Sequence, residues 1–203
     1  MSDAITHLVE GAMASPWVLL ALFAFAAIDG FFPAVPSESL VVTAGVFAAA
    51  DGVPSLPLVI AAAALGAFTG DHVSYLVGRK AGGRLTRRLR PGTRKQAAFA
   101  WAGRALDERG GTILVVCRYV PGARTAVTLT AGAVRHPLRS FSFFDGIAAL
   151  SWGTYSALVG YLGGAAFEDD PLKGVVLGLG LAISVAAAVE VVRHLRRRRP
   201  ALA

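Results

Sequence analysis

The chain has 203 residues, of which 55% are hydrophobic and only 16% are charged, and its mean hydropathy is +0.58. This composition is typical of an integral membrane protein and excludes a highly charged soluble protein. The formal net charge is +7, but the basic residues cluster in two places, so we interpret them as a topological signal and expect no binding to nucleic acid. Cys117 is the single cysteine and the four histidines are far apart, so the sequence predicts no disulfide, metal or other cofactor.

The first apolar stretch predicts a helix over residues 8–29 that is long enough to span a bilayer. The next stretch, residues 31–50, is also apolar, but Pro33 and Pro36 interrupt it and it carries Glu38. Prolines at this density do not suit a straight spanning helix. We therefore expect a re-entrant helical hairpin at 31–50.

Residues 56–77 predict a spanning helix rich in Gly and Ala, and such small residues let neighbouring helices approach closely in lipid. The segment that follows, residues 79–109, is basic, and Pro91-Gly92 divides it into two predicted short helices. We expect this segment to be amphipathic and to lie on an anionic membrane surface. A basic face that simply contacts solvent is the alternative.

A second interrupted apolar segment covers residues 113–134 and contains Arg118, Pro121-Gly122 and Arg124. Charges and a Pro-Gly pair within an apolar run favour a second re-entrant hairpin over a straight helix.

Two further spanning helices are predicted at 141–162 and 174–192, with an acidic loop between them and a basic tail at 193–203. The fold class is therefore an all-α membrane protein with about four transmembrane helices and two hairpins. The positive-inside rule places the basic segment, the tail and the C-terminus in the cytoplasm of a multi-pass protein. On this path the first hairpin enters the membrane from outside and the second from the cytoplasm.

An internal repeat supports the same plan. Residues 33–38, followed by Ala44-Gly45, match residues 120–124, followed by Ala131-Gly132. Further along each half, Val77-Gly78 matches Val159-Gly160. Each half is thus a broken hairpin followed by a spanning helix, and the two halves are inverted. Such an architecture places a substrate site near the midplane, where the broken segments meet. Chance similarity between Gly- and Ala-rich sequences is the alternative.

Five charged side chains lie in or beside the apolar segments: Asp29, Glu38, Asp71, Arg118 and Arg124. An unpaired charge at the bilayer centre costs about 2.5–3.5 kcal/mol on insertion scales, so we expect the acidic side chains of one hairpin to face the arginines of the other. A purely structural role is one interpretation of that pairing.

The functional interpretation is an anion site. Arg118 and Arg124, beside free backbone N–H groups of a Pro-Gly turn, suit a phosphate because guanidinium groups offer planar, bidentate donors. The three carboxylates would pair with the arginines or bind a coupling proton, since burial disfavours a charged carboxylate and a guanidinium favours it. Asp71-His72 suggests a proton relay, and hydrogen bonding within the bundle is the alternative for this pair.

These residues resemble the signature blocks of the DedA family, also called the SNARE-associated Golgi protein or VTT-domain superfamily. The blocks are residues 29–38 with Ala44-Gly45, Gly70-Asp71 with Tyr75 and Gly78-Arg79, and residues 118–125 with Ala131-Gly132. The resemblance covers residues 29–164 of what we expect to be a single membrane domain over residues 1–203, with an N-terminal helix at 8–29.

The resemblance implies an inner-membrane protein with opposed re-entrant hairpins, related to lipid scramblases. Bacterial members are implicated in returning undecaprenyl phosphate across the membrane and in membrane homeostasis that depends on the proton-motive force. The functional charges of the family carry over to Asp29, Glu38, Arg118 and Arg124. The two acidic residues are closer together here than in some members, and their order is exchanged.

We therefore expect a membrane lipid transporter, with a polyprenyl phosphate as partner, and not an enzyme. A non-selective phospholipid scramblase, a membrane scaffold and a lipid phosphatase are the alternatives. The phosphatase lacks an evident nucleophile, because neither hairpin contains a histidine and Ser37 has no neighbouring base in the sequence. The sequence also allows a homo-oligomer.

Overall fold

The computed structural model describes residues 17–32, 37–88, 92–120 and 122–166, together with the single residues 11, 15 and 180. These residues contain seven helices and no strand. The helices are α2 (Trp17–Phe31), α3 (Ser37–Ala50), α4 (Leu56–Arg88), α5 (Arg94–Arg109), α6 (Thr112–Cys117), α7 (Ala123–Ala133) and α8 (Leu138–Ala165). Several predicted features lie outside the described residues: the spanning helix at 174–192 except for Gly180, the tail at 193–203, and Pro33, Pro36 and Pro121.

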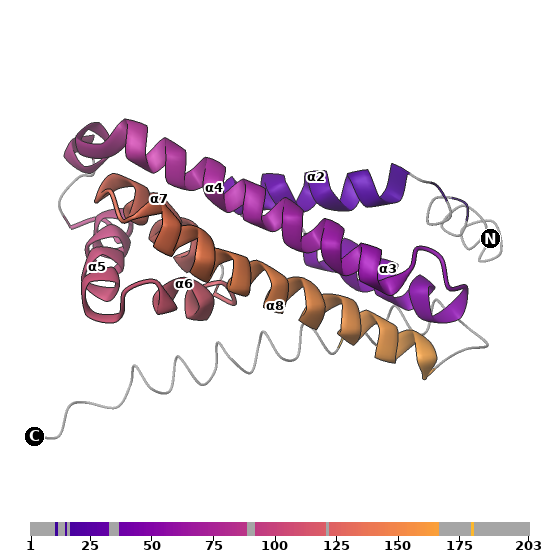
Figure 1. Cartoon of the computed structure of the whole chain (residues 1–203). Helices are drawn as coiled ribbons and strands as arrows, with labels where there is room; N and C mark the ends of the chain where they lie inside the picture. Colours follow the sequence, from indigo (N-terminus) through magenta and orange to yellow (C-terminus); the bar gives the residue numbers. More distant parts are fainter. Residues whose placement is uncertain are drawn as a thin grey trace, which may run out of the picture.

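The long helices α4 and α8 run side by side along the molecule, and the other elements pack around them (Figure 1). Among the described helices, the part of α4 from Leu56 to Gly82 is long and apolar enough to cross a membrane. Its 27 residues measure about 40 Å at the α-helical rise. The helix bends at Gly82, where φ is 24°, and continues to Arg88, so it extends beyond the predicted 56–77.

A helix is present over the predicted 141–162, as the unbroken, 28-residue α8, but it is less apolar than the Leu56–Gly82 part of α4 and does not meet the same criterion for a membrane span.

The prediction of a continuous spanning helix at 8–29 was wrong. Ser15 forms a bend, and its Oγ accepts a hydrogen bond from the Trp17 N–H at 3.3 Å. Pro16 has no N–H to continue a helix through this point. The helix that follows, α2, has 15 residues, whereas a spanning helix needs about 20.

Instead, α2 is the first arm of a hairpin of which α3 is the second arm. We call residues 17–50 the first hairpin and residues 112–133, which contain α6 and α7, the second hairpin. In Figure 1 the first hairpin starts and finishes at the end of the bundle where α4 begins, whereas the second occupies the opposite end. The interruption predicted in each segment is therefore present, but the first hairpin begins earlier than the predicted 31–50.

The two halves pack reciprocally, as the internal repeat predicts. The second arm of the first hairpin, α3, lies on α8, and the second arm of the second hairpin, α7, lies on α4. Glycines at repeat-equivalent positions permit both contacts, because a Cβ atom on any of them would lie 2.0–2.3 Å from a backbone oxygen of the facing helix. The pairs of glycine and facing residue are Gly45 with Ala157, Gly160 with Val42, Gly78 with Leu129, and Gly132 with Tyr75.

Large apolar side chains cover the outside of the bundle. Trp17, Leu65, Phe143 and Leu162 are all more than half exposed. An apolar surface of this extent is rare on a water-soluble monomer and suits contact with lipid.

The basic segment contains two helical parts separated at Gly92, as predicted, and the second of them is α5. One face of α5 is apolar and buries Ala102 and Leu106 against the second hairpin. This packing attaches the basic segment to the same end of the bundle as α6 and α7.

Candidate functional site

The two hairpins meet through an ion pair between Asp29 and Arg124. Asp29 lies in the last turn of α2 and Arg124 in the first turn of α7. The Nη2 atom of Arg124 lies 3.3 Å from Oδ1 of Asp29 and also donates a hydrogen bond to the Asp29 carbonyl oxygen. That carbonyl belongs to the C-terminal turn of α2, where free carbonyl groups and the helix dipole attract a cation. The structure thus brings together one predicted acid and one predicted arginine.

A second and deeper ion pair joins Arg118 to Asp71 of α4. The Nη1 atom of Arg118 donates to Oδ2 of Asp71 at 2.6 Å, and the two side chains are 1% and 0% exposed. Asp71 Oδ1 also lies 3.8 Å from Nε of Arg124, so this carboxylate connects the two arginines. The guanidinium of Arg118 lies over the Trp152 ring, 5.3 Å from its centroid, in a cation–π contact.

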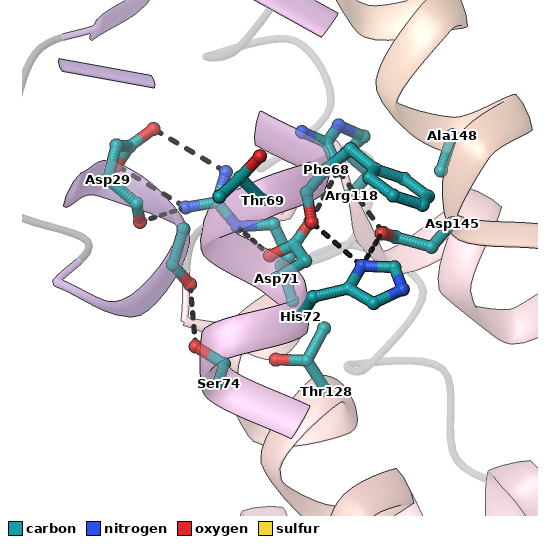
Figure 2. A network of polar contacts seen from close by, with 12 residues as sticks. Asp29, Phe68, Thr69, Asp71, His72, Ser74, Arg118, Thr128, Asp145 and Ala148 are labelled. Atoms are coloured by element: carbon teal, nitrogen blue, oxygen red, sulfur yellow. Dashed lines mark hydrogen bonds and ion pairs between the residues drawn. The ribbon is translucent and has the colours of Figure 1, made fainter. Parts of the chain in front are cut away.

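The cluster contains a third carboxylate, Asp145 of α8, which sequence reasoning did not select. Its Oδ1 lies 3.7 Å from Nη1 of Arg118, and its side chain is 2% exposed. Figure 2 shows Asp29, Asp71, Arg118 and Asp145 converging from different helices. Asp145 was missed because it is close to the start of the predicted 141–162 helix, where charged residues are common. The feature of the sequence that could have identified it is an aspartate within the apolar run FSFFDGIAAL.

His72 contacts Asp145 and not its sequence neighbour Asp71. Its Nδ1 lies 3.4 Å from Oδ2 of Asp145 and 2.8 Å from the Phe68 carbonyl oxygen, and its Nε2 lies 2.8 Å from the Ser142 hydroxyl. Adjacent residues of an α-helix point about 100° apart, so the side chains of residues 71 and 72 reach different partners. The predicted relay between these two neighbours is therefore replaced by a contact between α4 and α8.

Glu38 does not join the cluster as expected. It is half-buried in the first turn of α3, and it makes no ion pair or hydrogen bond within the described part of the chain. The preceding residue, Ser37, takes the position toward α2, where its Oγ donates to Oδ2 of Asp29 at 2.6 Å. The expected pairing of Glu38 with an arginine is not formed among the described residues, because the Glu38 carboxylate interacts electrostatically with Asp29 and Tyr155 instead.

The Pro-Gly turn also differs from expectation in its hydrogen bonding. Gly122 has φ 75°, a conformation that glycine adopts without steric cost, and begins α7. The backbone N–H groups of Ala123 and Arg124 already donate to the Val120 carbonyl oxygen, at 3.1 and 3.3 Å. These two donors are therefore not free to bind an anion, so the arginine side chains are the remaining groups of the predicted anion site.

The cluster has an excess of negative charge when every carboxylate is ionised. The carboxylates of Asp29, Asp71 and Asp145 contribute −3 and the two guanidiniums contribute +2, which leaves −1. Among the described residues, Oδ1 of Asp71 and Nε and Nη2 of Arg118 are buried without a hydrogen-bond partner. A buried polar atom without a partner is unfavourable, so the cluster has capacity to bind a proton or a further polar group.

The chain is similar to known membrane proteins over most of its length. Residues 35–162 match the family model of the VTT domain. An uncharacterized membrane protein of Mycobacterium tuberculosis is 29% identical over 197 residues, which cover 95% of this chain and 85% of the relative.

Two further relatives also match about four fifths of this chain. Protein DedA of Escherichia coli K12 is 25% identical over 166 residues, covering 81% of this chain and 76% of that protein. An alkaline phosphatase-like protein of Lactococcus lactis is 27% identical over 177 residues, covering 80% of this chain and 81% of that protein. No solved structure matches the chain.

Proposed function

Because this chain belongs to the VTT-domain family, which includes the DedA protein, we propose that it carries the phosphate headgroup of a membrane lipid across the cytoplasmic membrane. Undecaprenyl phosphate is the substrate that the family resemblance favours, and its recycling would serve homeostasis of the cell envelope. The observation that carries the proposal is the buried cluster in which Arg118 and Arg124 meet three carboxylates between two opposed hairpins.

In the proposed membrane arrangement both hairpins are re-entrant and enter from opposite sides. The basic segment, at the end of the bundle with α5 and the second hairpin, faces the cytoplasm, where it contacts anionic lipids. The cluster then lies between the two aqueous sides. Small movements of one hairpin against the other would expose it alternately to each side, as in other inverted-repeat transporters.

The two ion pairs differ in exposure, and this difference suggests where a phosphate binds first. The side chains of Arg124 and Asp29 are 11% and 14% exposed, whereas those of Arg118 and Asp71 are almost completely buried. A phosphate oxygen presents the same bidentate acceptor geometry as a carboxylate. We therefore propose that the headgroup displaces Asp29 from Arg124 and leaves the inner pair in place.

The charge of the cluster supports coupling to protons. With one excess negative charge already present, an added phosphate would raise the excess to at least two in a region shielded from water. Electrostatic repulsion is much stronger there than in bulk water. Binding of the headgroup would therefore favour protonation of a carboxylate, which makes a lipid phosphate and a proton move together.

The test is transport of undecaprenyl phosphate by the purified protein in proteoliposomes, with phosphatidylcholine as the control lipid. We expect selective movement of the phosphate lipid, stimulated by a proton gradient. Arg124→Gln should abolish the movement, and Arg139→Gln should not, because Arg139 is an exposed arginine at the start of α8. Equal movement of both lipids would favour a scramblase, and no movement of either would refute transport.

A phosphatase is the second candidate, and one structural observation favours it. The sequence offered no base for Ser37, but the fold places its Oγ 2.6 Å from the Asp29 carboxylate, next to Arg124. A hydroxyl, a base and a phosphate-binding arginine could together attack a phosphoryl group. The Lactococcus lactis relative is named alkaline phosphatase-like.

Release of inorganic phosphate from the lipid in the same vesicles separates the two functions. If the protein is a transporter, the vesicles release no inorganic phosphate and the Ser37→Ala variant still moves lipid. If it is a phosphatase, the wild-type protein releases inorganic phosphate and Ser37→Ala does not.

A further inference from the structure

A continuous line of polar contacts leads from the buried cluster toward the surface of the bundle. It runs from Arg118 to Asp145, from Asp145 to His72, and from His72 to the hydroxyl of Ser142. We propose that His72 and Ser142 form the route by which a proton reaches and leaves Asp145. This inference rests on the proposed proton-coupled transport and names the groups that perform the coupling.

The contacts of the His72 ring fix the position of its first proton. Both groups near Nδ1, the Phe68 carbonyl and the Asp145 carboxylate, are acceptors, so Nδ1 must carry hydrogen. The group at Nε2 is the Ser142 hydroxyl, which either donates or accepts. Neutral His72 therefore accepts a hydrogen bond at Nε2, and a protonated ring donates one there after the hydroxyl has rotated. The ring can gain a proton without moving.

Transfer through the ring conserves one proton. A proton arriving at Nε2 from the Ser142 side forms the imidazolium, and the Nδ1 proton then passes to Oδ2 of Asp145, 3.4 Å away. The ring is left neutral with its hydrogen on Nε2, and Asp145 becomes a neutral carboxylic acid. The reverse sequence returns the proton and restores the original tautomer.

Exposure increases along the route. Asp145 is 2% exposed and His72 is 21% exposed, and Ser142 is also partly exposed. Ser142 lies in the second turn of α8. The exposed Arg139 is in the first turn of this helix, and the exposed Arg135 is in the turn that precedes it. The outer end of the route therefore opens at the basic end of the bundle, the side that we assign to the cytoplasm.

The surroundings of His72 leave few other partners for its proton. The titratable groups nearest its ring are Asp145 of α8 and Asp71 of its own helix. Its other ring neighbours are the aromatic side chains of Phe68 and Phe141, with centroids 4.0 and 5.0 Å away. Aromatic rings take up no proton, so among the described residues the path continues through Asp145 and Ser142.

Proton binding at Asp145 would alter the inner ion pair. Ionised Asp145 attracts Arg118 Nη1 in competition with Asp71. Protonation removes that attraction and brings the net charge of the cluster from −1 to zero. The cluster can then accept an anionic headgroup at Arg124 at lower electrostatic cost. His72 and Ser142 thus act through Asp145 and do not contact the substrate.

The first experiment observes the ring directly. The full chain, labelled with ¹⁵N-histidine in nanodiscs, is titrated by NMR, and the signal missing from His72→Gln identifies His72. We expect the Nδ1–H tautomer in the neutral ring and a second protonation between about pH 5 and pH 8. In Asp145→Asn the midpoint should move to lower pH, because the carboxylate that favours imidazolium is gone. An Nε2–H tautomer, or no protonation in this range, would overturn the proposal.

The second experiment measures transport of undecaprenyl phosphate at several imposed proton gradients. The dependence on the gradient should be lost in His72→Gln and retained in His136→Gln. His136 lies in the turn between α7 and α8, and its ring contacts Ser140 in the first turn of α8. Full retention of the dependence in His72→Gln would overturn the route. If the wild-type protein moves no lipid, the proposed function fails, and the NMR titration still decides whether the proton route exists.

Discussion

The Nη2 atom of Arg124 lies 3.3 Å from Oδ1 of Asp29, and this ion pair connects the turns of two hairpins that enter the bundle from opposite directions. This pair is more exposed than the Arg118–Asp71 pair behind it. We therefore expect the outer pair to open during function and the inner pair to hold the fold together.

A double-mutant cycle on the outer pair tests whether the two hairpins are energetically coupled. Asp29→Asn, Arg124→Gln and the double variant are compared by the free energy of unfolding. Because the side chains touch, we expect a coupling energy of roughly 0.5–3 kcal/mol, with the double variant more stable than the two single losses would predict. If the losses of unfolding free energy in the two single variants simply add up in the double variant, the contact contributes no coupling energy.

Removal of Arg118 should mainly destabilise the protein. Arg118→Ala removes the close cation of Asp71, which keeps only the longer contact with Arg124, and the cation nearest to Asp145. Breaking a buried ion pair costs about 3–5 kcal/mol. The thermal unfolding temperature in detergent should fall accordingly, and Arg118→Ala combined with Asp71→Asn should recover part of the loss. An unchanged unfolding temperature would mean that the inner pair does not stabilise the fold.

The helix contact between α3 and α8 depends on Gly160. In Gly160→Ala the new Cβ would lie 2.0 Å from the Val42 carbonyl oxygen, so the two helices must separate. We expect a loss of about 1–3 kcal/mol in stability. Gly146→Ala is the control in the same helix, because its Cβ would meet the Phe68 ring at an ordinary 3.8 Å. Equal effects of the two substitutions would contradict the close approach.

His136 gives a stability change with pH that is separate from transport. Burial of its ring lowers the pKa of His136 below the ordinary value of 6.5, because burial disfavours the charged form. The unfolded chain then binds more protons than the folded protein, so the stability from this group is present above pH 6.5 and is lost as the pH falls toward the folded-state pKa. Thermal unfolding of wild type and His136→Gln across this range measures the effect, and parallel curves would refute it.

Cysteine labelling tests the opposed orientation of the hairpins. In a Cys117→Ala background, Asp51→Cys marks the connection between α3 and α4, and Arg139→Cys marks the start of α8. Both positions are exposed. A membrane-impermeant maleimide should label residue 51 from outside the cell and residue 139 only after the membrane is opened. Labelling of both from the same side would refute the inverted arrangement.

The sequence by itself determined the features that depend on local chemistry. The second hairpin is interrupted near the Pro-Gly pair, since α6 ends at Cys117 and α7 begins after Gly122, and Gly82 and Gly92 bend or interrupt the basic region. The repeated glycines at 45 and 132 marked the two halves of the internal repeat, and the structure shows that both lie at close helix contacts. The start of the first arm was missed because apolar composition alone does not show the bend at Ser15, after which α2 begins at Trp17.

Tertiary structure alone decided which charges meet. Pairing between helices depends on their rotation and relative depth, and one residue along a helix turns a side chain by about 100°. That single step lets Ser37 donate a hydrogen bond to Asp29, whereas the neighbouring Glu38 forms none among the described residues. It likewise sends His72 to Asp145 while Asp71 reaches Arg118. The close approach of the backbones at the glycine contacts fixes how far each helix is rotated and how far it is shifted along its neighbour. This arrangement depends on both helices of a pair, so it cannot be predicted from the sequence of one helix.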